Sequence, residues 1–140
     1  MIYHFRADDG TTESHSHVEF VDVDGNTRHL SNDEFVLSPT GEWKSPRTGA
    51  VNPSGWMLEV TRLEMKLKIA PFMHDQELDT RGTTMVVYWE GCCSITGTKA
   101  GRDITGNAYA ELVGYDRSHE RMNIGTFLFG DRFDWFTRRS

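Results

Sequence analysis

Apolar and polar residues alternate with a period of two along much of the chain. In 63–69 every odd position is apolar and every even position is charged. This pattern is typical of a strand with one buried face and one solvent face. Just before it, Trp56, Leu58 and Val60 occupy even positions. Because the parity changes at 61–62, we expect a tight hairpin there.

Two longer segments, 83–95 and 106–115, carry a different pattern. Each has one plainly apolar face and one face that mixes rings, carboxylates and smaller residues. A sheet with water on one side rarely has two such non-polar faces, whereas the wall of a barrel does, because it is packed outside and lined inside. A hairpin that turns about Ala100-Gly101 would join the two segments and could place Glu111 opposite Glu90.

Turn residues, mostly Gly, Pro, Asn and Asp, separate further short β-branched or aromatic runs, and no stretch of eleven residues has a helical period. The remaining candidate strands are 2–6, 17–23, 27–30, 35–37, 123–129 and 133–136. Together these elements predict an all-β fold, a single antiparallel β-barrel of about 8–10 strands.

Length and charge narrow the class of protein. A chain of 140 residues corresponds to one domain. Its net charge of −6 is spread along the sequence, which disfavours nucleic acid as a partner. No apolar stretch is long enough to span a membrane, and the first residues do not form a signal peptide, so a cytoplasmic location is expected. The adjacent Cys92 and Cys93 fit a reducing compartment.

Several short motifs occur together in one order. They are Asp24-Gly25 with Arg28-His29-Leu30, Trp43-Lys44-Ser45-Pro46-Arg47-Thr48-Gly49-Ala50 with Pro53 and Trp56, Asp75-Gln76-Glu77-Leu78, Tyr88-Trp89-Glu90-Gly91, and Glu111-Leu112-Val113-Gly114-Tyr115. With them the chain resembles the family of carotenoid hydratases, AttH-like "secreted hydrolases" and lipocalin-like Diels–Alderases. The resemblance implies a lipocalin-like fold and hydration or cyclisation of an apolar isoprenoid or polyketide-like substrate, without a metal or organic cofactor.

The chain departs from that family in its length. Members typically carry two lipocalin-like domains, and only the C-terminal one is matched, by 1–115. A homodimer, or a second lipocalin-like domain in trans, is therefore the expected protein partner. Residues 116–140 are interpreted as an extra C-terminal hairpin that completes the same domain.

Acid chemistry at an alkene needs a proton donor in a dry place. Glu90 fits this from its mid-strand position beside Tyr88, and Glu111 or Asp75 could assist it. The alternative is that Glu90 is a buried acceptor for Arg47, Arg62 or backbone N–H groups. For Asp75-Gln76-Glu77 the favoured interpretation is a turn that satisfies its own backbone.

Large rings form the candidate ligand-binding lining, with core packing as the alternative role for each. They are Trp43, Trp56, Trp89, Tyr88, Tyr109 and Tyr115. Arg47 could bind a ligand carboxylate or carbonyl, or it could brace its own loop.

Histidines raise a different possibility. His15 and His17 would share one strand face with Glu19, and His4 could lie on the adjoining strand. Such a set suits a cupin-like metalloprotein, but the spacing is shorter than in cupins and a polar edge strand explains it as well.

The leading hypothesis is a cofactor-free hydratase or cyclase with no bound metal, as the family resemblance implies. The second is a non-catalytic carrier of a small hydrophobic ligand, and the third is the metalloprotein.

Overall fold

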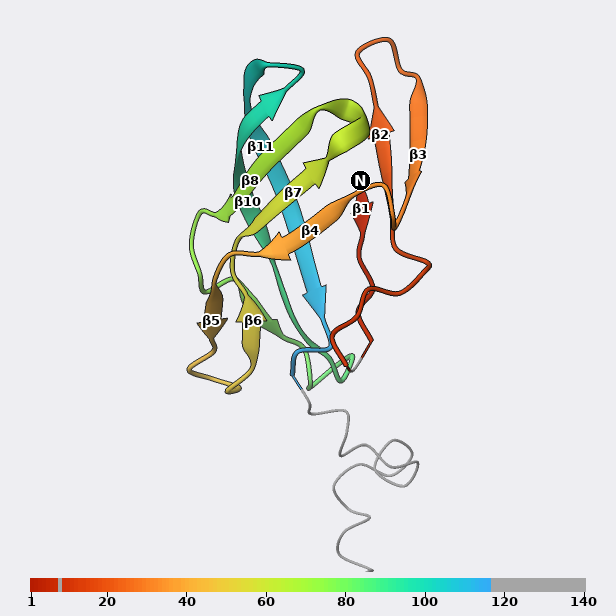
Figure 1. Ribbon diagram of the computed structural model, residues 1–140. Helices are drawn as coiled ribbons and strands as arrows, with labels where there is room; N and C mark the ends of the chain where they lie inside the picture. Colours follow the sequence, from red (N-terminus) through yellow and green to blue (C-terminus); the bar gives the residue numbers. More distant parts are fainter. Residues whose placement is uncertain (8, 117–140) are drawn as a thin grey trace, which may run out of the picture. The chain divides into compact units, whose positions relative to one another are not determined.

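The protein is described by a computed structural model that places residues 1–7 and 9–116 (Figure 1). These residues form eleven strands and one short 3-10 helix. The strands are β1 (Ile2–Tyr3), β2 (His17–Val21), β3 (Thr27–Ser31), β4 (Val36–Pro39), β5 (Glu42–Lys44), β6 (Val51–Pro53), β7 (Trp56–Val60), β8 (Met65–Pro71), β9 (Glu77–Asp79), β10 (Val87–Lys99) and β11 (Arg102–Val113). The prediction of an all-β fold is confirmed.

The chain divides into two compact units. Among the described residues, unit 1 comprises 1–42, 53–74 and 92–109, and unit 2 comprises 43–52, 75–91 and 110–116. Among the residues that the structure places, no helix has the length and apolar character to cross a membrane. The single-domain interpretation stays a prediction.

In unit 1 the main sheet contains the hairpin that the alternation predicts. β7 pairs antiparallel with β8, and Val60 lies opposite Met65 across a 3-10 turn at Thr61–Leu63. The odd-numbered apolar residues from 63 to 69 are all buried, as is Trp56 on β7. The hairpin is therefore confirmed, whereas the expected strand begins at Met65 and not at Leu63, which lies in the 3-10 turn. β4 adds to the other edge of β7 (Figure 1).

A second sheet of unit 1 has the order β1-β2-β3 and is antiparallel throughout. Val18 pairs with Leu30, and both are buried. The residues that alternate with Val18 on β2, His17 and Glu19, therefore lie on the opposite face. Glu19 pairs directly with His29 on β3.

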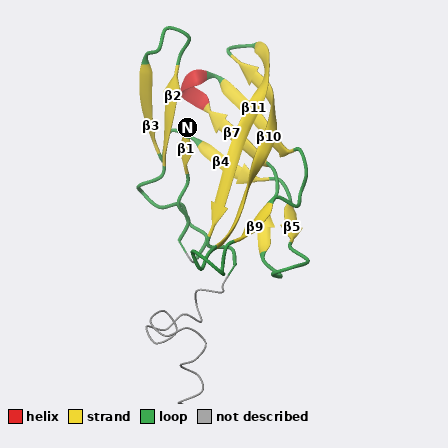
Figure 2. Cartoon of the chain, turned by 180° about the vertical axis from the view of Figure 1, so that it is seen from behind, coloured by secondary structure: helices red, strands yellow, loops and turns green. Residues whose placement is uncertain are grey.

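The long hairpin of β10 and β11 turns at Ala100-Gly101, as expected (Figure 2). Both turn residues have positive φ, 48° and 73°, which suits the tight two-residue turn that follows the twist of a hairpin. The strand begins at Val87, so its predicted start at 83 is wrong. The chain turns before it, with the N–H of Thr83 bonded to the carbonyl of Thr80, and Met85 takes a left-handed φ of 63°.

Three strands of three residues each, β5, β6 and β9, were not expected from the sequence. β5 pairs with β6, and β9 pairs with β10 so that Glu77 lies opposite Trp89. The segment interpreted as a turn at Asp75-Gln76-Glu77 thus leads directly into a strand. The expected strands 123–129 and 133–136 lie outside the described residues.

Candidate functional site

The site in unit 2 begins with the turn that joins β5 to β6. The N–H groups of Arg47 and Thr48 both donate to the Ser45 hydroxyl oxygen at 3.1 Å, and the N–H of Gly49 donates to the Ser45 carbonyl at 3.0 Å. Gly49 has a φ of 79°, a left-handed conformation that glycine adopts without strain. The turn is therefore held in one shape, with its side chains fixed.

That turn surrounds a buried carboxylate, Glu77, whose side chain is 1 % exposed. Ser45 donates its hydroxyl to Oε1 at 2.7 Å, and Thr48 donates to Oε2 at 2.8 Å. The Arg47 Nε lies 3.4 Å from Oε1. Burial of a carboxylate is costly unless hydrogen-bond donors compensate for the lost water. Because both oxygens already accept hydrogen bonds, Glu77 is suited to hold the turn rather than to donate a proton.

Arg47 extends this arrangement to the chain before β9. Its Nη2 donates to the Glu77 carbonyl oxygen at 2.6 Å and to Asp75 Oδ1 at 3.1 Å. The Arg47 side chain is 51 % exposed, so these contacts are partly screened by water. The geometry shows the loop-bracing role that was one of the two sequence interpretations of Arg47. Asp75 is exposed and serves as one of its acceptors.

A glycine on β10 completes the contacts of unit 2. A Cβ at Gly91 would overlap the side-chain amide of Gln76, so glycine is what lets Gln76 lie against the strand. The Glu90 N–H donates to the Gln76 carbonyl at 3.1 Å. The motifs around Ser45, Asp75 and Glu90 are separate in sequence, and the fold brings them together.

Glu90 occupies the other face of β10, next to Tyr88, and both side chains are half-buried. In the described chain no side chain or N–H group donates to the Glu90 carboxylate. The two arginines proposed as its partners are used elsewhere: Arg47 as above, and Arg62 on Glu34 at 3.0 Å. The alternative in which Glu90 accepts from either arginine is therefore wrong. Glu111 is exposed on β11. That Glu111 lies opposite Glu90 stays a prediction.

The six aromatic residues predicted to line a ligand site differ in their burial. Trp56 is buried in unit 1 and Trp89 in unit 2, where they pack as core residues. Trp43, Tyr88 and Tyr115 are half-buried, whereas Tyr109 is 65 % exposed. Their roles as ligand contacts stay predictions.

The histidine set differs from the one expected. Among the described residues, His17, Glu19 and His29 form the group whose ligand atoms lie close enough to hold a metal ion. His15 and His4 are not in it; the His4 ring bonds the Thr12 hydroxyl at 3.1 Å, and burial lowers the pKa of His4.

These antiparallel strands define a lipocalin-like β domain. Kievitone hydratase from Nectria haematococca shares this fold, with a TM-score of 0.64 at 17 % identity over 80 % of this chain and 33 % of that chain. The AttH candidate NE1406 from Nitrosomonas europaea is similar at 35 % identity, with a TM-score of 0.65 over 79 % of this chain and 32 % of that chain. The profile described as AttH-like matches residues 1–115. The chain belongs to the AttH-like family.

This membership confirms the resemblance and the lipocalin-like fold, and it disfavours the cupin-like alternative. The chain spans about a third of the length of either solved structure. No curated protein matches the sequence.

Sequence reasoning missed Glu77 and His29 as site residues. Glu77 was assigned to a turn, although a serine, an arginine and a threonine within four residues, 45–48, offer the donors that a buried carboxylate needs. His29 becomes the partner of Glu19 only through the β2–β3 register, which depends on the length of the connection at 22–26.

Proposed function

We propose that this domain binds an apolar small molecule against the Glu90 face of β10 and adds water to a carbon–carbon double bond, or closes a ring across one. The observation that carries the proposal is the contrast between two neighbouring carboxylates. Glu77 is buried and both its oxygens accept hydrogen bonds, whereas Glu90 is half-buried and accepts none from the described chain. Glu90 is therefore free to exchange a proton with a ligand. Family membership and the fold shared with a hydratase support the reaction class.

In the proposed hydration, the Glu90 carboxyl gives its proton to one alkene carbon. Water attacks the other carbon through its oxygen and then returns a proton to the Glu90 carboxylate, so that one water is added overall. An apolar ligand over Glu90 displaces solvent, so that the carboxyl and the alkene meet with little competing water. The half-buried Tyr88 ring on the same face would stabilise positive charge that develops on carbon. Asp75 would act indirectly, through Arg47 and the turn it braces.

A ligand at Glu90 must be shielded from water, and β11 alone does not provide that shielding. Tyr109 and Val113 are 65 % and 58 % exposed, and Glu111 is exposed as well. The chain also spans about a third of its solved relatives. These observations support a second lipocalin-like domain in trans, or a second copy of this chain, as the partner that encloses the ligand.

The test compares Glu90→Gln with Glu42→Gln, a matched change at an exposed position on β5 that should leave turnover unchanged. Each variant is incubated with a panel of isoprenoid and polyketide-like alkenes, and mass spectrometry follows the gain of one water or a change of retention without a change of mass. Ligand binding is measured separately with the fluorescent apolar probe N-phenyl-1-naphthylamine. We expect Glu90→Gln to abolish turnover and to leave probe affinity within a few-fold. Full turnover in Glu90→Gln would refute the assignment.

A non-catalytic carrier is the second candidate, and the exposure of Glu111 and Tyr109 favours it. A carrier binds the apolar probe with one site per chain but turns over no alkene in the wild-type protein, with or without an added second domain. Failure to bind the probe at all would contradict both functions.

A further inference from the structure

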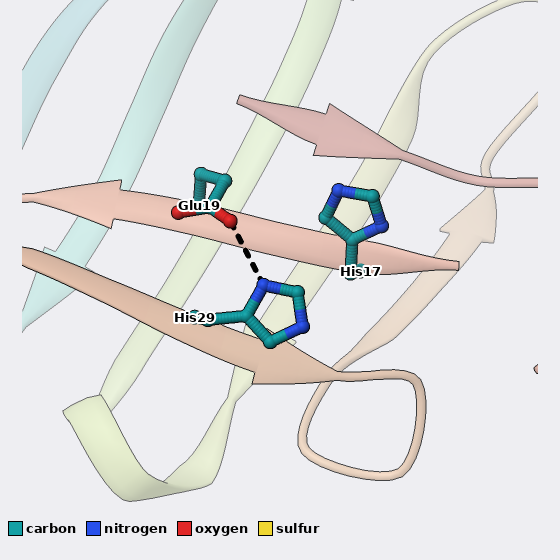
Figure 3. Close-up of side chains that lie close together, drawn as sticks. All are labelled: His17, Glu19 and His29. Carbon is teal, nitrogen blue, oxygen red and sulfur yellow. Dashed lines mark hydrogen bonds and ion pairs between the residues drawn. The ribbon is translucent and has the colours of Figure 1, made fainter. Parts of the chain in front are cut away.

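The exposed face of the β1-β2-β3 sheet carries a cluster of potential metal ligands. His17 and Glu19 project from β2, and His29 projects from the opposite position on β3 (Figure 3). We propose that these three residues form a site for one divalent transition-metal ion of the Zn²⁺ type. The site lies in unit 1 and is independent of the Glu90 chemistry.

The strand register explains why three separate residues converge. Glu19 and His29 are directly paired across the ladder, and His17 is two residues from Glu19 on the same strand, so all three side chains share one face. The His29 Nδ1 lies 2.8 Å from Glu19 Oε1, and the two imidazole rings stack with centroids 5.0 Å apart. One ligand atom from each residue lies within 4.8 Å of those of the others.

Hydrogen bonds at the ring nitrogens prepare both histidines as ligands. The His17 Nδ1 lies 2.9 Å from the His15 carbonyl oxygen, which can only accept, so the ring donates from Nδ1. The lone pair of the neutral His17 ring is then on Nε2, which is the nitrogen free to bind a metal. The His15 carbonyl is then an outer-shell acceptor, a regular feature of histidine metal sites. In His29 it is Nδ1 that faces Glu19 Oε1, and a metal ion bound between them would replace the proton that the two atoms share.

Only small side-chain movements are needed to close the site. Zn²⁺ binds nitrogen and oxygen at about 2.0–2.2 Å, so the ligands of a tetrahedral site lie about 3.3 Å apart. The Glu19–His29 contact is already shorter than this, and the widest separation of 4.8 Å leaves about 1.5 Å to close. The side chains of His29 and Glu19 are 60 % and 36 % exposed, so they can rotate while the β2–β3 ladder holds the backbone.

The ligand set selects the kind of ion. Two imidazoles with one carboxylate suit Zn²⁺, Ni²⁺ or Cu²⁺, whereas Mg²⁺ and Ca²⁺ prefer oxygen ligands alone. Three protein ligands leave at least one position for water. Because the ligands come from both β2 and β3, a bound ion would join the two strands and stabilise this sheet by mass action.

The test uses the full chain without a polyhistidine tag, titrated with Zn²⁺ alone by isothermal calorimetry and with Co²⁺ by visible absorption. We expect one ion per chain. His29→Ala should weaken Zn²⁺ binding at least tenfold, and Glu19→Gln should weaken it as well. His15→Ala is the matched control, because the backbone carbonyl that it contributes is retained, and it should leave the affinity within twofold.

Circular dichroism checks that each variant keeps the β fold, and histidine-ring NMR follows the ring-nitrogen signals of His17 and His29 on Zn²⁺ addition. Both signals should shift in the wild-type protein. Absence of one-to-one binding would overturn the proposal. So would equal losses in His29→Ala and His15→Ala, because His15 is not a ligand of the proposed site.

Discussion

Replacement of Glu77 by alanine is the sharpest perturbation of unit 2, since it removes the acceptor that Ser45, Arg47 and Thr48 share. A hydrogen bond to a charged group contributes about 1.5–3 kcal/mol, and two hydroxyl donors are involved. The half-exposed Arg47 adds less than about 1 kcal/mol because water screens it. Alanine recovers part of the cost of burying the carboxylate. We therefore expect Glu77→Ala to lower the free energy of unfolding by about 3–5 kcal/mol.

Urea unfolding followed by tryptophan fluorescence measures this change, since the buried Trp89 lies opposite Glu77 in the β9–β10 ladder. Asp75→Asn is the matched control. It removes the charge from the contact of Arg47 with Asp75, in which both side chains are about half exposed, and should cost at most about 1 kcal/mol. In a double-mutant cycle, Ser45→Ala and Glu77→Ala should be coupled by about 1–3 kcal/mol, because they remove two ends of one buried hydrogen bond.

Glu77→Gln keeps the volume and one acceptor oxygen, so it provides a measurement if the alanine variant does not fold. We expect an intermediate loss of about 1–2 kcal/mol. The reasoning is refuted if Glu77→Ala costs no more than Asp75→Asn, because the carboxylate would then not hold the turn.

Two positions outside this cluster give independent predictions. A Cβ at Gly97 would overlap the Lys66 carbonyl oxygen on the paired strand. Gly97→Ala should therefore lower the free energy of unfolding in urea by about 1–3 kcal/mol. The control Gly106→Ala has open space around it and should change the free energy of unfolding by no more than about 0.5 kcal/mol. Hydrogen bonds from Arg81 lower the pKa of Asp79 from 3.8 to about 2. Because the folded-state pKa is the lower one, this contribution is present above pH 3.8 and is lost as pH falls toward 2. The difference in free energy of unfolding between wild type and Asp79→Asn should therefore shrink over that window, and a difference that is constant with pH would contradict the assignment.

Periodicity predicted the parts of this fold in which one strand face is uniformly apolar. Residues 63–69 and the change of parity after Val60 were enough to place β7, β8 and their turn. The Ala100-Gly101 turn was expected from the turn residues that lie between two strand-like runs. These features depend on neighbours in sequence, which a single sequence displays directly.

The features that were missed depend on partners far along the chain. β9 has three residues, and its Glu77 is polar yet buried because donors from 45–48 surround it. A local pattern assigns such a residue to the surface. Likewise, Met85 adopts a left-handed φ, which an apolar residue does not predict. The start of β10 was therefore placed too early.

The mutual contacts of Ser45, Glu77, Gln76 and Gly91 bear on how relatives of this domain are found. Several residues of the motifs that carry the family resemblance, among them Arg47, Thr48 and Asp75, also hold the turn and β9 in place. A search with these motifs therefore retrieves proteins that share an architecture, whatever reaction each performs. Differences in chemistry between such proteins should be sought at residues on the opposite face of the same strands. Glu90 is the first such residue to compare.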